Sequence, residues 1–334
     1  MKKFSKILAV IMAVLICISF ASCSKRDIPE YDNPEDNPNA VRTGLSVISE
    51  VRTDEVETDS VTKRMFISTA AAVLVDEDGK VIDAKVDIME INSDLETNGG
   101  VVTELKSAKE LGNAYKPDIE SETGKSKTEQ IVALEEFCKG KTADEINESF
   151  DYFSGITKDE SLLKECDINV KTEVKAITQA VSGAKALDAQ SNDTLKLSIS
   201  AQNVENTDEE KDVLSYRMQY AAVTVDKKGV ITSCVLDESE GSVTILDGEF
   251  KEFPGVYNTK KQLGIQYGLK AVSSINSEWF EQVKGLEDFA KGKTASELTG
   301  VVGDDNFPTD SDLLSVCTIE VNELVANLVK AVNS

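Results

Sequence analysis

The sequence contains no histidine among its 334 residues. This absence excludes serine–histidine–aspartate and cysteine–histidine nucleophile systems, histidine general bases and histidine-ligated zinc. Cysteine is also scarce, with six residues and no pair at the Cys-x-x-Cys spacing. A thioredoxin-like redox site, a zinc knuckle and the dense disulfide framework of a small secreted protein therefore have no support in the sequence.

Basic residues are outnumbered, because 36 Lys and Arg face 60 Asp and Glu and the formal net charge is −24. Such a surface repels nucleic acid, whose binding depends on Lys and Arg neutralising phosphates. It also repels anionic lipid headgroups. We therefore expect no nucleic-acid partner, and we expect any membrane attachment to come from acyl chains.

The chain starts with a short basic segment, followed by an apolar run from about Ile7 to Phe20. That run is too short for a stable membrane span and is typical of a signal peptide. The sequence Phe20-Ala21-Ser22-Cys23 resembles a bacterial lipobox, in which cleavage precedes the cysteine and its sulfur carries a lipid. We predict a signal peptide over residues 1–22 and an extracytoplasmic protein anchored to the cell membrane by a lipid on Cys23. An ordinary secretory signal with an incidental cysteine is the alternative.

Residues 23–41 predict a lipidated cysteine followed by a disordered tether. Half of the six prolines, Pro29, Pro34 and Pro38, stand there among Asp, Asn and Glu. Such a stretch buries too little apolar area to offset the entropy lost on ordering. A spacer of this kind lets a folded domain stand off the membrane.

The remainder of the sequence is an internal repeat with a period of about 150 residues. Residues 71–79 match 221–229, and residues 134–142 match 286–294. A period of this length is a whole domain, far longer than a solenoid unit. We predict two homologous domains, over residues 42–186 and 195–334, with a polar linker over 187–194.

Both copies predict the same order of elements. Alternating apolar residues indicate an opening strand, and two apolar runs around a turn at Gly79 or Gly229 indicate a hairpin. A helix with one apolar face ends before Gly140 or Gly292, where glycine is typical. An amphipathic helix closes each copy. The predicted class is α+β, with a small antiparallel sheet and packed helices in each domain.

Four Thr-x-x-Glu or Thr-x-x-Asp sequences predict capping boxes at helix starts. They begin at Thr142, Thr157, Thr294 and Thr309. The Lys-Gly-Lys-Thr sequences that end at Thr142 and Thr294 are explained in the same way, as the end of one helix and the start of the next. Binding of an anionic ligand by their lysines is the alternative.

Four cysteines remain in the repeats, and Cys166 and Cys317 occupy equivalent positions. We interpret these two as small packed side chains, because free cysteine is among the most buried residue types. A reactive thiol would need a nearby cation or a helix start. A disulfide among these two, Cys138 and Cys234 stays open.

No metal site and no catalytic residue are predicted. The acidic turn 76–79 lacks the further ligands of a calcium loop, and the second copy has Lys227 and Lys228 in the equivalent turn. No acid–base pair stands at a recognisable spacing. Whether the protein is an enzyme is therefore uncertain, and a protein without catalysis is favoured.

The densest group of aromatic and small residues stands between residues 267 and 280. Aromatic walls with a few polar groups are typical of ligand pockets. The alternative is that Trp279 belongs to the core of the helix that it begins. The candidate ligand-binding or cofactor-binding residues are Tyr267, Lys270, Ser273, Ser274 and Trp279.

The hairpin sequence Ala-Val-Thr-Val-Asp-x-x-Gly-x-Ile and the closing amphipathic helix resemble the FMN-binding domain of exported bacterial flavoproteins. Residues 261–270, 278–282 and 292–294 are similar to exported lipoproteins of the Firmicutes type that carry such domains in tandem. The resemblance implies an extracytoplasmic domain that binds FMN and takes part in electron transfer. Flavinylated members carry Ser-Gly-Ala-Thr before the last helix, whereas residues 166–169 and 317–320 read Cys-Asp-Ile-Asn and Cys-Thr-Ile-Glu. The resemblance therefore implies FMN without a covalent link.

Two function classes follow from these observations. The first is a lipoprotein without catalysis that binds an unknown small ligand or an envelope protein. The second is an FMN-binding electron-transfer lipoprotein, in which the chemistry would belong to the cofactor. A hydrolase with paired carboxylates is a third reading, supported only by the abundance of Asp and Glu, most of which we expect on the surface.

Overall fold

The computed structural model describes residues 40–54, 63–94, 105–117, 119–204, 212–246, 249–250 and 257–334. These residues belong to one compact unit. Cys23, the predicted signal peptide and nearly all of the predicted tether lie outside the described residues, so they stay predictions.

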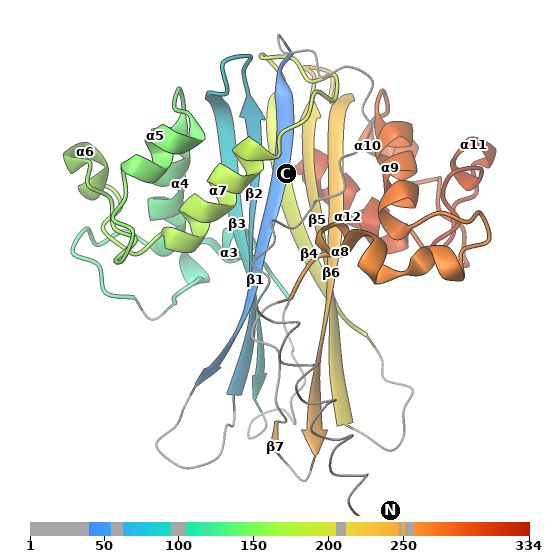
Figure 1. Ribbon diagram of the computed structural model, residues 1–334, viewed down its shortest axis with the longest axis horizontal. Helices are drawn as coiled ribbons and strands as arrows, with labels where there is room; N and C mark the ends of the chain where they lie inside the picture. Colours follow the sequence, from blue (N-terminus) through green and yellow to red (C-terminus); the bar gives the residue numbers. More distant parts are fainter. Residues whose placement is uncertain are drawn as a thin grey trace, which may run out of the picture. The chain divides into compact units, whose positions relative to one another are not determined.

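The first half of the chain contains a three-stranded antiparallel sheet in the order β1-β2-β3, with helices after it (Figure 1). The strands are β1 (Arg42–Asp54), β2 (Lys63–Val75) and β3 (Val81–Asp94). The helices are α3 (Ala108–Leu111), η1 (Gly112–Ala114), α4 (Lys127–Cys138), α5 (Ala143–Glu148), α6 (Glu160–Leu163) and α7 (Lys171–Ser182).

The second half repeats this order and adds a two-residue strand, β7, to its sheet, which has the order β4-β5-β6-β7. The strands are β4 (Thr194–Val204), β5 (Asp212–Val225), β6 (Ile231–Leu246) and β7 (Glu249–Phe250). The helices are α8 (Lys260–Leu263), η2 (Gly264–Tyr267), η3 (Leu269–Ala271), α9 (Trp279–Ala290), α10 (Ala295–Leu298), α11 (Ser311–Leu314) and α12 (Asn322–Asn333). The predicted α+β class with small antiparallel sheets is confirmed.

The predicted hairpins join β2 to β3 and β5 to β6. Gly79 and Gly229 lie in these turns with φ of 80° and 76°, a conformation that glycine adopts without strain. The Asp76 carboxylate accepts the N–H groups of Asp78 and Lys80, at 3.0 and 2.8 Å. The acidic turn is therefore an Asx turn in which this carboxylate serves the backbone.

The predicted helix ends at Gly140 and Gly292 are confirmed, with φ of 75° and 79°. Thr142 and Thr294 then form capping boxes at the starts of α5 and α10, as predicted. The Lys-Gly-Lys-Thr sequences thus have a structural explanation at each position.

The two other predicted capping boxes are wrong. The N-cap of α6 is Asp159 and the N-cap of α11 is Asp310, and their carboxylates accept N–H groups two and three residues further on. Aspartate caps a helix as well as threonine does, and it stands two residues closer than Thr157 to the first helical turn of α6. The Thr157 hydroxyl instead donates to the Ser149 carbonyl.

Both faces of the central strand β2 are buried, because residues alternate between two cores. One face packs against the helices of its own half and the other against the second sheet (Figure 1). The first face carries Ile67, Ala71, Val73 and Val75. The second face carries Phe66, Ala70, Ala72 and Leu74, which pack with Leu195, Leu197, Ile199, Tyr216, Met218, Tyr220 and Ala222. The layers within this unit are therefore helices, sheet, sheet and helices.

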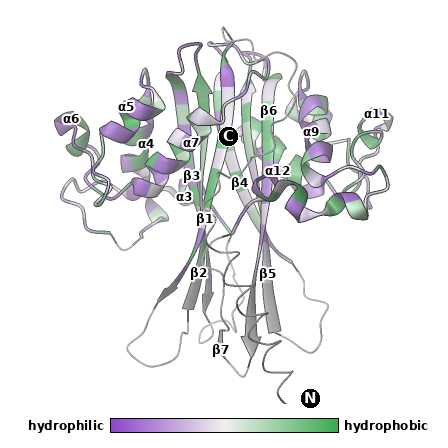
Figure 2. Cartoon of the chain, viewed as in Figure 1, coloured by the Kyte–Doolittle hydropathy of each residue, from purple (hydrophilic) through white to green (hydrophobic). Residues whose placement is uncertain are grey.

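The distribution of hydropathy follows these layers. Apolar residues lie along the strands, whereas the helices carry hydrophilic residues on their outer faces (Figure 2). A polar network also crosses between the sheets, where the Tyr220 hydroxyl lies 2.8 Å from Ser68 Oγ and 2.7 Å from Ser239 Oγ. Burial raises the pKa of Tyr220 to about 12, so this hydroxyl stays protonated. The network satisfies polar groups that would otherwise destabilise a dry core.

Candidate binding cavity

Tyr267 and Trp279 come together, as their sequence pattern suggested, but they surround a side chain of the protein itself. The Lys260 ammonium lies 4.7 Å from the centre of the Tyr267 ring and 5.4 Å from that of Trp279. Lys260 is only 5% exposed, and its Nζ lies 2.5 Å from Glu238 and 2.7 Å from Glu240. Although burial lowers its pKa, the two carboxylates outweigh burial and the net shift is upward. This cation–π cluster stabilises a buried charge.

The other three candidates also have partners within the protein. The Lys270 N–H donates to Glu278 Oε2 at 3.2 Å, and its side chain is exposed. Ser273 Oγ accepts a hydrogen bond from the Gln282 side chain, and Ser274 Oγ donates to Thr318 Oγ1. None of the five predicted residues lines either cavity described below. These five candidate residues therefore have no part in either of these two cavities.

The four cysteines of the described residues are buried and free. Burial raises the pKa of Cys166 and Cys317 to about 11 and that of Cys138 to about 12. Burial also raises the pKa of Cys234 well above its usual range. Because the thiolate is the reactive form, these thiols are poor nucleophiles. The interpretation of Cys166 and Cys317 as packed side chains agrees with this environment.

The part of the chain that the structure describes contains no group of three or more Cys, Asp or Glu side chains placed to hold a metal ion. None of its helices is both long enough and apolar enough to span a bilayer.

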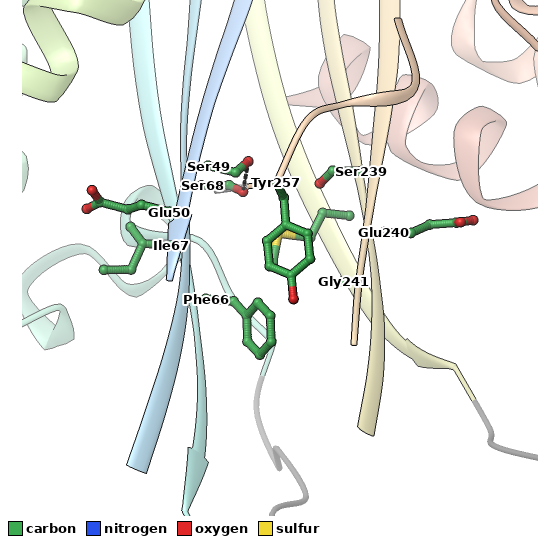
Figure 3. A pocket seen from close by; sticks show the side chains of 10 residues that line it. Ser49, Glu50, Phe66, Ile67, Ser68, Ser239, Glu240, Gly241 and Tyr257 are labelled. Atoms are coloured by element: carbon green, nitrogen blue, oxygen red, sulfur yellow. Dashed lines mark hydrogen bonds between the residues drawn. The ribbon is translucent and has the colours of Figure 1, made fainter. Parts of the chain in front are cut away.

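A small cavity lies between the two sheets near Ser49, Phe66 and Tyr257 (Figure 3). Tyr257 lies between the strands of the two sheets, and the Ser49 and Ser68 hydroxyls are 2.8 Å apart beside it. The volume is about 10 Å³, close to the minimum for one water molecule. This cavity is too small for an organic ligand.

A buried polar network lies where α3 and α4 meet β3. Asp87 Oδ1 accepts the N–H groups of Ile88 and Lys109, at 2.8 and 3.0 Å. Glu135 Oε1 accepts the Val86 N–H at 2.6 Å and the Lys109 ammonium at 2.8 Å. Burial raises the pKa of Asp87 despite these donors. The network fixes α3 and α4 to the edge of the first sheet.

The second half repeats this network with Asp237, Lys261 and Glu287. Asp237 Oδ1 accepts the N–H groups of Glu238 and Lys261, and Glu287 Oε1 accepts the Leu236 N–H and the Lys261 ammonium. Reasoning from the sequence missed both networks. The signal was present, because each of the three residue types recurs in the two copies at nearly the same spacing.

A much larger cavity, of about 440 Å³, lies beside the first network. This volume falls within the range of about 300–1,000 Å³ that is typical of ligand pockets. Its walls come from β3, α3, β4 and α12, so both halves contribute. Four lysines line it, together with Asp87 and Glu110, the apolar Leu195 and Leu197, and the hydroxyls of Ser107, Thr194 and Ser198. The lysines are Lys85, Lys109, Lys196 and Lys330.

Each of these lysines also has a partner within the chain. Lys85 pairs with Asp83 and Lys109 with Glu135, while the Lys196 ammonium bonds to the Ser334 carbonyl. Lys330 Nζ lies 2.9 Å from Glu110 Oε1 and 2.8 Å from the Ile199 carbonyl oxygen. An ammonium has three N–H donors, and these bonds use one or two of them. Donors therefore remain for a ligand, because the side chains of Lys85, Lys109 and Lys330 are 30% to 36% exposed.

The repeat relates this seam to a second one, which involves β6 of the second half and β1 and α7 of the first half. The second seam carries a different set of side chains. Val235 stands in place of Lys85 and Gln179 in place of Lys330. Lys196 of β4 lies opposite Val223, whereas Gly44 of β1 lies opposite Val73, the residue equivalent to Val223. Gly44 is therefore the equivalent of Lys196. A side chain at Gly44 would lie 2.1 Å from the Ala180 carbonyl oxygen, because α7 lies directly on β1. The cationic cavity is therefore a feature of one seam, and helix backbone fills the corresponding space near β1.

Sequence reasoning did not identify this cavity, because its lysines come from four separate elements. No protein-family model, no curated protein and no solved structure matches this chain. The resemblance to FMN-binding lipoproteins thus stays a prediction.

Proposed function

We propose that the protein is a membrane-anchored extracytoplasmic lipoprotein that binds a ligand and performs no chemistry of its own. The cavity at the seam of the two halves carries this proposal. It gathers four ammonium groups in a chain whose net charge is −24, and it has the volume of a ligand pocket. Leu195 and Leu197 add apolar surface. These features suit an organic anion with an apolar portion.

The chemistry of the cavity walls favours binding over catalysis. Asp87 and Glu135 are held by backbone N–H groups and by Lys109, so their oxygens serve the fold. The Ser107 hydroxyl bonds to the Asp87 and Glu110 side chains, but Ser107 is buried and caps α3, so this hydroxyl also serves the fold. The lysines can attract and orient an anion, which is sufficient for a binding protein.

The anchor is tested by the Cys23→Ala substitution in the full chain. The variant should appear in the soluble fraction, because one acylated cysteine would supply all of the membrane affinity. Cys17→Ala is the matched control, since Cys17 belongs to the predicted signal peptide, and its product should stay with the membrane. Membrane retention of the Cys23→Ala variant would contradict the proposed lipid site.

Binding is tested by thermal unfolding of the protein with inorganic phosphate and with the dipeptide Ala-Glu as probes. A ligand that binds the folded state raises the Tm by mass action. The rise should be lost in Lys330→Gln and kept in Lys164→Gln, a control at an exposed lysine outside the cavity. Equal Tm shifts in both variants, or no shift with either probe, would contradict binding in this cavity.

The visible spectrum separates this proposal from the flavin reading. Protein purified from a flavin-supplemented host should be colourless. Flavin absorbance at about one equivalent per chain would overturn the proposal and favour an electron-transfer role.

A further inference from the structure

The wall of the large cavity includes one uninterrupted stretch of β4, Thr194–Ser198. β4 stands at the edge of its sheet, with β5 on its only paired side. Along an antiparallel edge strand, every second residue directs its N–H and C=O away from the sheet. The cavity therefore borders the outer backbone groups of β4.

The first half shows which residues of β4 face outward. Thr43 of β1 lies opposite Leu74, and Leu195 of β4 lies opposite Thr224, the equivalent residue. Thr43 exchanges two backbone hydrogen bonds with Lys185, at 2.8 and 3.0 Å, so its N–H and C=O point away from β2. By the same register Leu195, Leu197 and Ile199 point away from β5. The Ile199 carbonyl agrees, because it accepts the Lys330 ammonium.

Two other sheet edges have some of their outer groups covered, although, within the described part of the chain, no bond from outside the sheet reaches the backbone of Leu45 on β1. On β1, Lys185 pairs with Thr43, and the Gln262 side chain donates to the Val47 carbonyl at 2.8 Å. On β3, carboxylates accept the N–H groups of three alternate residues. These pairs are Ala84 with Asp83, Val86 with Glu135 and Ile88 with Asp87. Such cover prevents unwanted pairing of strand edges.

The edge of β4 has no such cover at Leu195, although the equivalent Thr43 of β1 is covered, and it has none at Leu197. Among the described residues, nothing outside the sheet forms a hydrogen bond to the backbone of either one. This uncovered stretch of β4 lines the cavity. An edge that is open beside a cavity is suited to receiving a strand from a partner.

We propose that the cavity receives an extended acidic peptide segment, which pairs antiparallel with β4 at Leu195 and Leu197. This inference rests on the proposed binding function and names its ligand. The pairing of Lys185 with Thr43, which is antiparallel, provides the pattern within the same chain. Side chains of the bound segment alternate between two sides. Acidic side chains on one side would lie among Lys85, Lys196 and Lys330.

The lysines favour an acidic segment over other peptides. Relative to the equivalent seam, the cavity gains Lys85, Lys196 and Lys330 in place of Val235, Gly44 and Gln179. It gains one opposing acid, Glu110 in place of Gln262. The remainder of the chain is strongly acidic and would repel such a peptide, whereas four lysines line the cavity beside Asp87 and Glu110.

The test uses the full chain with Cys23→Ala and a blocked synthetic peptide, acetyl-Thr-Val-Glu-Val-Glu-Val-Thr-amide. Binding is measured by isothermal titration calorimetry at low salt. Two control peptides differ in one property each. In the first control both glutamates are lysines, and in the second the backbone nitrogens of both glutamates and of the valine between them are methylated. Both controls should bind roughly tenfold more weakly or worse, because one loses the charge attraction and the other loses backbone donors.

Variants of the protein test whether the peptide binds at β4. Lys196→Glu should weaken binding of the acidic peptide by roughly tenfold, while Lys164→Glu, an equal charge change outside the cavity, should leave it nearly unchanged. Far-ultraviolet circular dichroism of both variants shows whether they fold alike. If Lys196→Glu does not fold, Lys330→Gln takes its place.

The outcomes distinguish this inference from the proposed function. If the methylated peptide binds as tightly as the parent, no strand pairing occurs and the peptide inference is overturned, although binding of an anion in the cavity survives. The same conclusion holds if inorganic phosphate raises the Tm through Lys330 while no peptide binds. If neither the binding of the peptides nor the Tm shift with phosphate depends on Lys196 or Lys330, both proposals fail.

Discussion

Asp237 is a buried carboxyl whose protonation is set by its place in the fold. Burial raises its pKa to about 6, although Lys261, the Thr259 hydroxyl and two backbone N–H groups act in the opposite direction. The folded state therefore binds more protons than the unfolded state between about pH 4 and pH 6, and the contribution of this group to the free energy of unfolding falls as pH rises. We predict that Asp237→Asn becomes more stable relative to wild type by about 2 kcal/mol between pH 4 and pH 7. Urea denaturation over that pH range measures the difference.

Asp226 provides a control, because its pKa is shifted in the opposite direction to that of Asp237. The N–H groups of Val230 and Lys228 lower its pKa, so it stabilises the folded state when ionised and this contribution is lost as pH falls. Asp226→Asn should therefore lose stability relative to wild type as pH rises. A difference between Asp237→Asn and wild type that does not vary with pH would contradict a carboxyl that titrates near 6.

At the scale of elements, local signals predicted well and contacts between distant residues did not. The hairpin glycines, the helix ends at Gly140 and Gly292 and the apolar faces of the long helices depend on neighbours within a few residues, so the sequence reveals them. The continuous apolar run of β2 is consistent with burial on both faces, but it does not reveal that the second sheet packs on one of them. The cavity was missed for a related reason, since Lys85 and Lys330 meet only when the two sheets pack.

The contact of α7 with β1 depends on the missing side chain of Gly44. An added Cβ would lie 2.1 Å from the Ala180 carbonyl oxygen, and helix backbone moves less readily than a side chain. We predict that Gly44→Ala lowers the free energy of unfolding by about 1–3 kcal/mol, the usual cost of overpacking. Lys196→Ala at the equivalent place on β4 is the control, and it should change stability by less than about 1 kcal/mol. Equal effects of the two substitutions in urea denaturation would show that α7 and α12 pack alike.

At the scale of the whole molecule, duplication produced two halves that share a core. The apolar face of the first sheet, with Phe66, Leu74 and Met89, packs on Ile199, Tyr216 and Tyr220 of the second. Hydrogen bonds also join the halves, from Tyr220 to Ser68 and between Thr43 and Ser233. Each half on its own would expose an apolar sheet face to water, which favours association. The seam cavity exists only in the joined molecule, because each half supplies part of its walls.

This shared core predicts that the halves do not fold independently. Residues 40–186 and 187–334, expressed separately, should bind the dye ANS and unfold without a cooperative transition, because burial of the inter-sheet face is lost. Co-expression of the two pieces should restore a soluble complex that unfolds cooperatively, which controls for damage from the cut itself. Circular dichroism during urea titration, with ANS fluorescence beside it, measures both outcomes. If each piece alone unfolds cooperatively at the same urea concentration as in the intact chain, the two sheets are independent domains and the inter-sheet face contributes little to stability.

If the prediction holds, ligand binding at the seam should raise the stability of both halves together, since a site built from both is formed only when they are joined.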